Sequence, residues 1–100
     1  MQVKLCGIVP KDEEVGIGSV LEKITTPIIE LYPETAGERK LCIRGTIVKV
    51  VGFTGEEFKD LKVEIQYPPT PCWLAKDRQL LGGQIYILRR EDAVGFTLVG

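Results

Sequence analysis

Residues 61–67 read Leu-Lys-Val-Glu-Ile-Gln-Tyr, so that apolar and polar side chains alternate without interruption. Successive side chains of a β-strand point to opposite faces of its sheet, and this period therefore predicts a strand with one buried face and one exposed face. Val63 and Ile65 are expected to be buried, while Lys62 and Glu64 are expected to face solvent. Antiparallel sheets commonly leave one face open to water, so this segment favours an antiparallel β-fold.

Similar patterns predict strands along the rest of the chain. Val and Ile together supply 20 residues and Thr supplies 7, whereas Ala, the best helix former, supplies only 3. We expect strands over 3–9 and 61–67, a long strand over 41–53, and a closing hairpin formed by 84–90 and 96–99. Between these strands we expect a polar loop over 11–18, a hairpin turn over 54–57 and a turn over 76–79. Gly45, inside the long strand, is expected to mark a bend or bulge.

Residues 19–32 admit either a helix or a strand. Ser19 and Glu22 have the spacing of a capping box, which favours a helix. Pro27 opposes it, because a proline inside a helix costs about 3 kcal/mol and removes a hydrogen bond. We therefore expect a strand over 24–32.

Residues 70–81 also admit a helix, since Thr70 and Pro71 form a typical helix start and Gly82 a typical stop. If this helix and the one over 19–32 both form, the element order is βαββαβ. That order is typical of a ferredoxin-like α+β domain. This fold is the alternative to an all-β one.

Composition and charge limit the possible functions of the chain. One hundred residues are expected to form a single domain, 1–100. The net charge of -1 provides no broad cationic surface for duplex nucleic acid or an anionic membrane. The chain has no His, which excludes Ser-His-Asp triads, Cys-His pairs and histidine-containing metal sites. We therefore expect a protein that is not an enzyme and needs no cofactor.

Cys6, Cys42 and Cys72 are far apart in the sequence and form no C-x-x-C pair, so no metal site is expected. Cys6 and Cys42 lie in strand-like segments and are expected to be buried, reduced thiols. No apolar run approaches the roughly 20 residues of a membrane span, and none near the start resembles a signal peptide. The expected location is the cytoplasm. An excess of Glu over Asp and the absence of Asn are a bias reported for thermophilic proteins.

A distinctive cluster lies in the middle of the chain. Residues 28–33 read Ile-Ile-Glu-Leu-Tyr-Pro and are followed by Gly37, a Glu38-Arg39 pair and an apolar segment over 41–43. This arrangement resembles the signature strand-loop-strand of the small OB-fold subunit of archaeal and eukaryotic RNA polymerases. Segments 44–50, 61–67 and 85–90 resemble further strands of that family in the same order. The residues that carry the resemblance are Tyr32, Pro33, Gly37 and Gly45.

The resemblance implies an all-β fold, a small antiparallel OB-type barrel. It also implies a non-catalytic assembly subunit of a DNA-directed RNA polymerase, which binds larger protein subunits of a transcription complex through one face of the barrel. No membrane partner is expected. The resemblance does not identify the contacting face or the strand pairing.

The alternative function is that of a free-standing OB-type module for single-stranded nucleic acid. Such modules stack bases on exposed aromatic side chains beside basic residues. Tyr67 and Trp73 are the candidates for stacking, and Lys62, Arg89 and Arg90 are the candidates for phosphate contact. Tyr86 and Phe96 are further aromatic candidates, although these two and Trp73 are more typical of a protein core than of a stacking surface.

Overall fold

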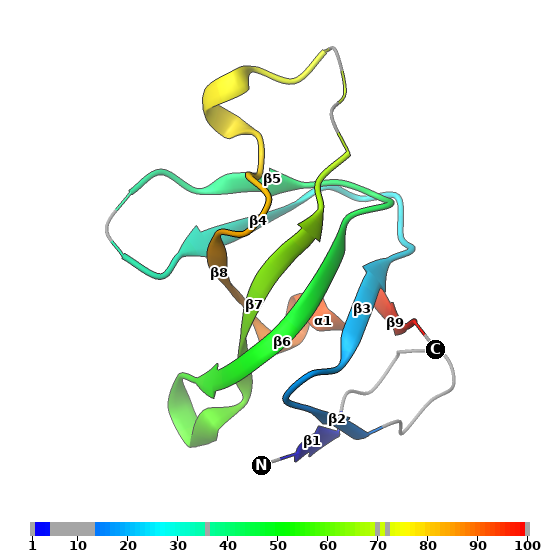
Figure 1. The fold of residues 1–100 in the computed structure, drawn as a ribbon, viewed down its shortest axis with the longest axis vertical. Helices are drawn as coiled ribbons and strands as arrows, with labels where there is room; N and C mark the ends of the chain where they lie inside the picture. The colour runs from blue at the N-terminus through cyan, green and yellow to red at the C-terminus, as the bar shows by residue number, and fades with distance from the viewer. Residues whose placement is uncertain (1, 5–13, 36, 70, 72, 100) are drawn as a thin grey trace.

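A computed structural model describes residues 2–4, 14–35, 37–69, 71 and 73–99 of the chain. Seven strands form one antiparallel sheet in the order β5-β4-β8-β7-β6-β3-β9, and the sheet curls into a half-barrel (Figure 1). Two further strands, β1 and β2, pair separately. The predicted all-β, barrel-like fold is confirmed.

The strands are β1 (Gln2–Lys4), β2 (Glu14–Gly16), β3 (Val20–Lys23), β4 (Ile29–Pro33), β5 (Lys40–Cys42), β6 (Ile47–Thr54), β7 (Asp60–Tyr67), β8 (Ile85–Leu88) and β9 (Phe96–Leu98). Two 3₁₀ turns, η1 (Glu56–Phe58) and η2 (Lys76–Arg78), lie between strands. Within the described part of the chain the only α-helix is α1 (Arg90–Ala93), a single turn. The ferredoxin-like alternative is therefore wrong, since neither 19–32 nor the described residues of 70–81 form an α-helix.

The hairpin of β6 and β7 forms the centre of the sheet and agrees with the sequence prediction. Val48 pairs with Ile65, and Val50 pairs with Val63. Val63 and Ile65 are buried, whereas Lys62 and Glu64 lie partly exposed on the other face. The register shifts between Val50 and Gly52, which indicates a bulge that bends the strand. The predicted alternation of buried and exposed faces is confirmed.

The long strand expected over 41–53 is interrupted. The chain leaves β5 after Cys42, turns through Gly45 at a φ of 97°, and enters β6 at Ile47. Thr46 stabilises the turn, because its hydroxyl donates to the carbonyl oxygen of Ile43 at 2.8 Å. β5 pairs with β4, whereas β6 pairs with β3 and β7. The prediction of one continuous strand over 41–53 is therefore wrong. Gly45 marks a turn between two strands rather than a bulge within one.

The strand expected over 24–32 is only partly correct. Residues 20–23 and 29–33 form β3 and β4, while the chain bends at 24–28 around Pro27. The prediction of a polar loop over 11–18 is wrong at residues 14–16, which form β2 and pair with β1. The strand expected over 3–9 is observed at its first two residues, and positions 5–9 lie outside the described residues.

The closing hairpin expected from 84–90 and 96–99 is also wrong. β8 pairs with β7 and β4, whereas β9 pairs with β3 at the far edge of the sheet. The helical turn α1 carries the chain between them, and its Ala93 is buried. A hairpin needs the chain to reverse directly between its strands, and this helical turn redirects it instead.

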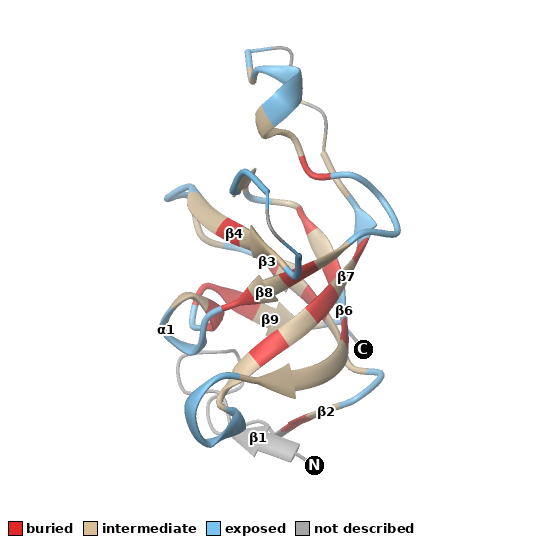
Figure 2. Ribbon diagram, turned by 90° about the vertical axis from the view of Figure 1, so that its left-hand side faces the viewer, coloured by how far each residue is buried: buried red, intermediate tan, exposed pale blue. Residues whose placement is uncertain are grey.

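The inner face of the half-barrel holds one continuous core (Figure 2). Its members are the buried apolar residues Val15, Leu21, Leu31, Cys42, Val48, Val50, Leu61, Val63, Ile65, Leu80, Tyr86, Leu88, Ala93 and Phe96. The predicted burial of Cys42 is confirmed, and the chain's other two cysteines lie outside the described residues. No helix in the described residues has the length and apolar character of a membrane span.

Candidate binding surface

The connection between β7 and β8, residues 68–84, projects beyond the end of the sheet (Figures 1 and 2). Trp73 and Leu81 within it are 63% and 58% exposed, and Tyr67 at its start is 57% exposed. Exposed aromatic side chains are frequent at protein interfaces. We call these three residues and the connection that carries them the Trp73 surface.

The base of this connection is held firmly to the sheet. The amide of Gly83 donates to the Ile65 carbonyl at 2.8 Å, and the amide of Ile65 donates to the Gln84 carbonyl at 3.0 Å. Leu80 is buried in the core. Burial raises the pKa of the Tyr86 hydroxyl, and the backbone of Leu81 opposes this shift. The Trp73 surface therefore starts from a fixed position.

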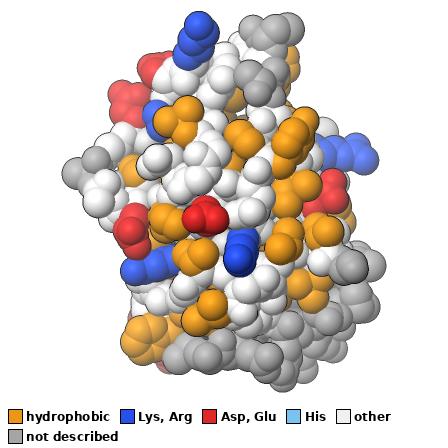
Figure 3. Space-filling view, in the orientation of Figure 1, with side chains coloured by type: hydrophobic (Ala, Val, Ile, Leu, Met, Phe, Trp, Pro, Cys, Tyr) orange, Lys and Arg blue, Asp and Glu red, His pale blue; other side chains and the backbone are white. Residues whose placement is uncertain are grey.

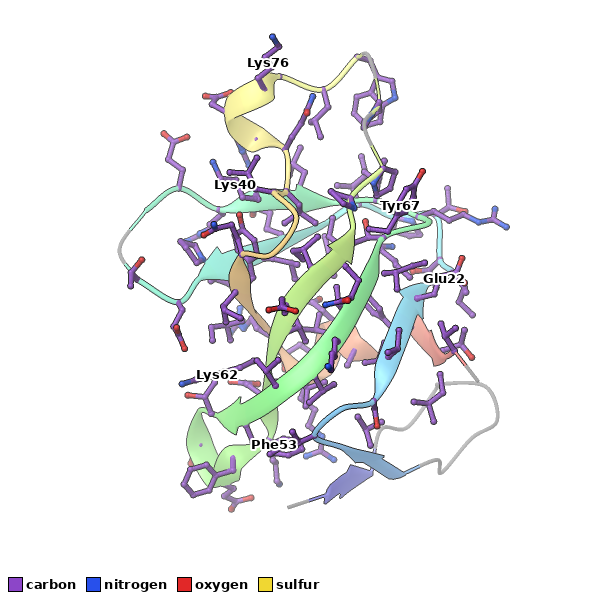
Figure 4. The ribbon with its side chains drawn as sticks, viewed as in Figure 1. Glu22, Lys40, Phe53, Lys62, Tyr67 and Lys76 are labelled. Atoms are coloured by element: carbon purple, nitrogen blue, oxygen red, sulfur yellow. The ribbon has the colours of Figure 1, made fainter. Side chains whose placement is uncertain are left out.

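The hairpin of β4 and β5 supports the connection from the side. Arg78 of η2 forms an ion pair with Glu30 at 3.0 Å, and its Nε donates to the Arg39 carbonyl at 3.1 Å. Lys40 donates to the Asp77 carbonyl. A parallel bridge joins Leu41 to Gln79, so the connection also covers the outer edge of β5. Figure 4 shows Lys40 and Lys76 on these two neighbouring segments.

An open hollow of about 300 Å³ lies where the hairpin and η2 meet. It is lined by Glu30, Gly37, Glu38, Arg39 and Arg78. Both guanidinium groups contact the Glu30 carboxylate, Arg78 at 3.0 Å and Arg39 at 3.7 Å. The Glu30 carboxylate therefore bridges two guanidinium groups, and Glu38 adds a second carboxylate to the lining of the hollow. Glu30 and Arg78 were not predicted from the sequence, because residues 48 positions apart carry no local signal of contact.

The residues that carry the family resemblance lie in two places. Tyr32 and Pro33 are in β4, and the guanidinium carbon of Arg39 lies 4.6 Å from the centre of the Tyr32 ring, a cation–π distance. Gly37 lies against Pro33, since a Cβ at Gly37 would be 3.4 Å from the proline Cγ. Gly45 is not part of this group and instead faces Pro69 from the turn before β6. The structure therefore brings together Tyr32, Pro33 and Gly37 but not Gly45.

The residues proposed for nucleic-acid contact lie toward opposite ends of β7. Tyr67, which belongs to the Trp73 surface, is at one end of the strand, and Lys62 is near the other end (Figure 4). The part of the strand that separates them spans about 17 Å at the usual rise per residue. Tyr86 and Phe96 are buried in the core, so they are not available for stacking.

Lys62 and Arg89 already have acidic or aromatic neighbours, and Arg90 is the first residue of α1. Lys62 forms an ion pair with Glu34 at 3.0 Å. Arg89 forms one with Glu91 at 3.3 Å and also lies near the Tyr32 ring. Figure 3 shows that hydrophobic, basic and acidic side chains are interspersed over this side of the molecule.

Lys23 is among the largest fully buried side chains of the described residues, and its burial was not predicted from the sequence. Its ammonium group donates to the Thr25 carbonyl and the Thr25 hydroxyl, both at 2.8 Å, and to the Pro27 carbonyl at 2.5 Å. Burial lowers the pKa of Lys23, while nearby Cys42 and Asp92 oppose this shift. All three ammonium hydrogens have acceptors, so this lysine stabilises the bend between β3 and β4.

Cys42 is expected to make stability depend on pH. Burial raises the pKa of its thiol from 9.0 to about 11. Between these values the folded state keeps the proton and the unfolded state loses it, so the free energy of unfolding falls as the pH rises from 9 toward 11. The difference between the pKa values corresponds to a loss of at most about 2.7 kcal/mol. Stability below pH 9 is unaffected by this group.

Urea denaturation of the native chain and of a Cys42→Ala variant, between about pH 8 and about pH 11, measures this effect. Lys23 contributes in the opposite direction, because its pKa is lowered in the folded state. The difference between the two chains therefore gives the effect of the thiol together with its influence on the pKa of Lys23. The variant is expected to lose less stability in alkali, and an identical decline in both chains would contradict the assignment.

None of the described residues form a group of three or more His, Cys, Asp or Glu side chains arranged to hold a metal ion. The thiol of Cys42 is buried and its raised pKa keeps it protonated, so it does not act as a nucleophile at neutral pH. Comparison with known proteins finds no family model, no curated protein and no solved structure that matches this chain.

Proposed function

We propose that this chain is a non-catalytic subunit that binds larger proteins through the Trp73 surface. The observation that carries the proposal is the exposure of Trp73, at 63%, on a connection fixed at its base and along its side. Trp, Tyr and Arg are the residues that most often dominate the energy of protein interfaces. A surface that is already ordered also loses less conformational entropy on binding.

We further propose that the larger proteins are subunits of a DNA-directed RNA polymerase in the cytoplasm. The support is the sequence resemblance at Tyr32, Pro33 and Gly37. Those residues adjoin the Trp73 surface, because the hollow lined by Gly37 and Arg39 is also lined by Arg78. The residues that carry the resemblance therefore lie beside the connection that carries Trp73.

Copurification from the native source, with a tag on the chain, tests this function. The chain is expected to return with large polymerase subunits, and Trp73→Ala is expected to weaken the interaction at least about 30-fold, the effect of losing an interface hot spot. Ile17→Ala is the matched control, since Ile17 is 64% exposed but lies away from the connection. Equal losses in both variants, or recovery without polymerase subunits, would contradict the proposal.

Single-stranded nucleic acid is the second candidate partner, because Tyr67 and Trp73 are both exposed. Each base stacked on such a ring contributes about 1 to 3 kcal/mol. However, Lys62 and Arg89 are already paired with carboxylates, and the net charge is -1. We therefore expect negligible binding of oligonucleotides near physiological salt.

Titration of fluorescent oligonucleotides at low and moderate salt distinguishes the two functions. The parent chain is compared with Trp73→Ala and Tyr67→Ala, and circular dichroism checks that each variant is folded. Micromolar affinity that survives moderate salt and disappears in either variant would favour nucleic acid over protein as the partner.

A further inference from the structure

The turn between β6 and β7 has an unusual backbone for its sequence. The amide of Lys59 donates to the Glu56 carbonyl at 3.3 Å, and the two residues between them, Glu57 and Phe58, have φ angles of 57° and 54°. Positive φ at both central residues is typical of a type I′ turn. Such turns strongly prefer Asn-Gly, because most side chains are strained in this conformation.

Nothing within the described part of the chain offsets this strain at Phe58. Its side chain is 55% exposed, so its apolar surface is largely not buried by folding. No described residue of η1 is buried. Backbone strain of this kind persists where the surrounding structure holds it in place, and it is frequent at binding sites.

The base of the turn is held in place by Asp60. Its Oδ1 accepts a hydrogen bond from the Arg90 amide at 3.0 Å, which ties the turn to the start of α1. Gly55 lies against the same carboxylate so closely that a Cβ there would overlap it, and its φ is 79°. Glu57 is held by an ion pair with Lys59 at 2.6 Å. The turn thus presents Phe58 from a fixed support.

We propose that the tip of the β6–β7 hairpin is a second recognition site, at which Phe58 enters an apolar pocket of a partner protein with Lys or Arg at its rim. Three carboxylates, those of Glu56, Glu57 and Asp60, lie at this turn against two cations, Lys59 and Arg90, and this excess of negative charge favours a basic rim. β7 separates this tip from the Trp73 surface by about 26 Å at the usual rise of a strand. The two sites are therefore independent.

Stability gives the first test. The double variant Glu57→Asn with Phe58→Gly places the preferred residues in the turn, and it is expected to raise the midpoint of thermal unfolding by about 4 to 8 °C. A variant that unfolds at the same or a lower temperature would overturn the proposal, because Phe58 would then be stabilising the fold rather than being held for a partner.

Binding gives the second test. A benzophenone amino acid replaces Phe58 in the full chain in its native host, and the cross-linked peptide is identified by mass spectrometry. The adduct is expected to map to an apolar protein segment that contains Lys or Arg, and its yield is expected to fall at least about fivefold in E56Q/E57Q, in line with the loss of about 1 kcal/mol of charge interaction. The same probe at Ile17 is the control.

Adducts to lipid or nucleic acid, equal yields from positions 58 and 17, or a yield that does not depend on the two glutamates would each overturn the proposal. Trp73→Ala does not alter the hairpin tip. Failure of the proposed polymerase contact is therefore distinguishable from failure of this second site.

Discussion

Replacement of Lys23 by Met is expected to lower the free energy of unfolding by about 3 to 5 kcal/mol, as is typical when one partner of a buried charged network is removed. The methionine side chain has a similar length but no donor. It would leave the Thr25 and Pro27 carbonyls and the Thr25 hydroxyl without the ammonium group that now satisfies them. Each unsatisfied buried group costs about 1 to 3 kcal/mol. Domains of this kind have a total stability of about 5 to 15 kcal/mol, so at the low end of that range this loss approaches complete unfolding.

Lys49→Met is the matched control, since Lys49 lies exposed on β6. Its expected effect is less than about 0.5 kcal/mol, as for most surface substitutions. Urea denaturation measures both variants. Similar losses in the two chains, or little loss in either, would show that the ammonium group of Lys23 does not stabilise the bend between β3 and β4.

Replacement of Ile65 by Ala is expected to cost about 2 to 5 kcal/mol. Ile65 is 1% exposed, and its strand β7 pairs on both sides, with β6 and with β8. The substitution removes buried apolar surface and leaves a cavity among side chains from several strands, which relax only in part. Thermal or urea denaturation gives the loss directly.

Lys62→Ala provides the comparison on the other face of the same strand. The side chains of Lys62 and Glu34, which form an ion pair, are both exposed, and such exposed pairs contribute about 0 to 1 kcal/mol to stability. The loss is therefore expected to be clearly smaller than for Ile65. Comparable losses would mean that β7 does not have one buried face and one solvent-facing face.

The hairpin of β6 and β7 shows how much of the fold the sequence predicts. The alternation over 61–67 predicts both the strand and its buried face, because the side-chain period of a strand is a local property. The turn after β6 lies close enough in sequence to predict the pairing with β7. The conformation of that turn was not predictable, since Glu57 and Phe58 are not residues that type I′ turns prefer.

The sequence gives a weak indication of the role of Lys23. This lysine falls on the same alternating phase of β3 as Leu21, which is buried. A lysine on a buried phase is rare unless it is paired. The hydrogen-bond acceptors of its ammonium group, however, come from a bend around Pro27 that was expected to be a strand. The sequence therefore did not predict the hydrogen bonds that offset the cost of burying this lysine.

The exposure of Trp73 depended on tertiary structure. A tryptophan near a turn is compatible with either a core or a surface position, and its neighbours in the sequence do not distinguish the two. Two tertiary contacts hold the connection outside the sheet and so keep Trp73 exposed. They are the ion pair of Arg78 with Glu30 and the bridge from Gln79 to Leu41. These contacts join residues that are 38 to 48 positions apart.

By itself, the sequence determined that the chain is built of strands, which side chains of β7 are buried, and that β6 and β7 form a hairpin. Only the tertiary structure decided that β9 pairs with β3 rather than β8, that β5 and β6 are separate strands, and that the connection after β7 covers the edge of β5. The physical reason is the range of the interactions. A side-chain period and a short turn act between neighbours, whereas the pairing of distant strands depends on loop-closure entropy and on how all the apolar faces fit together in one core.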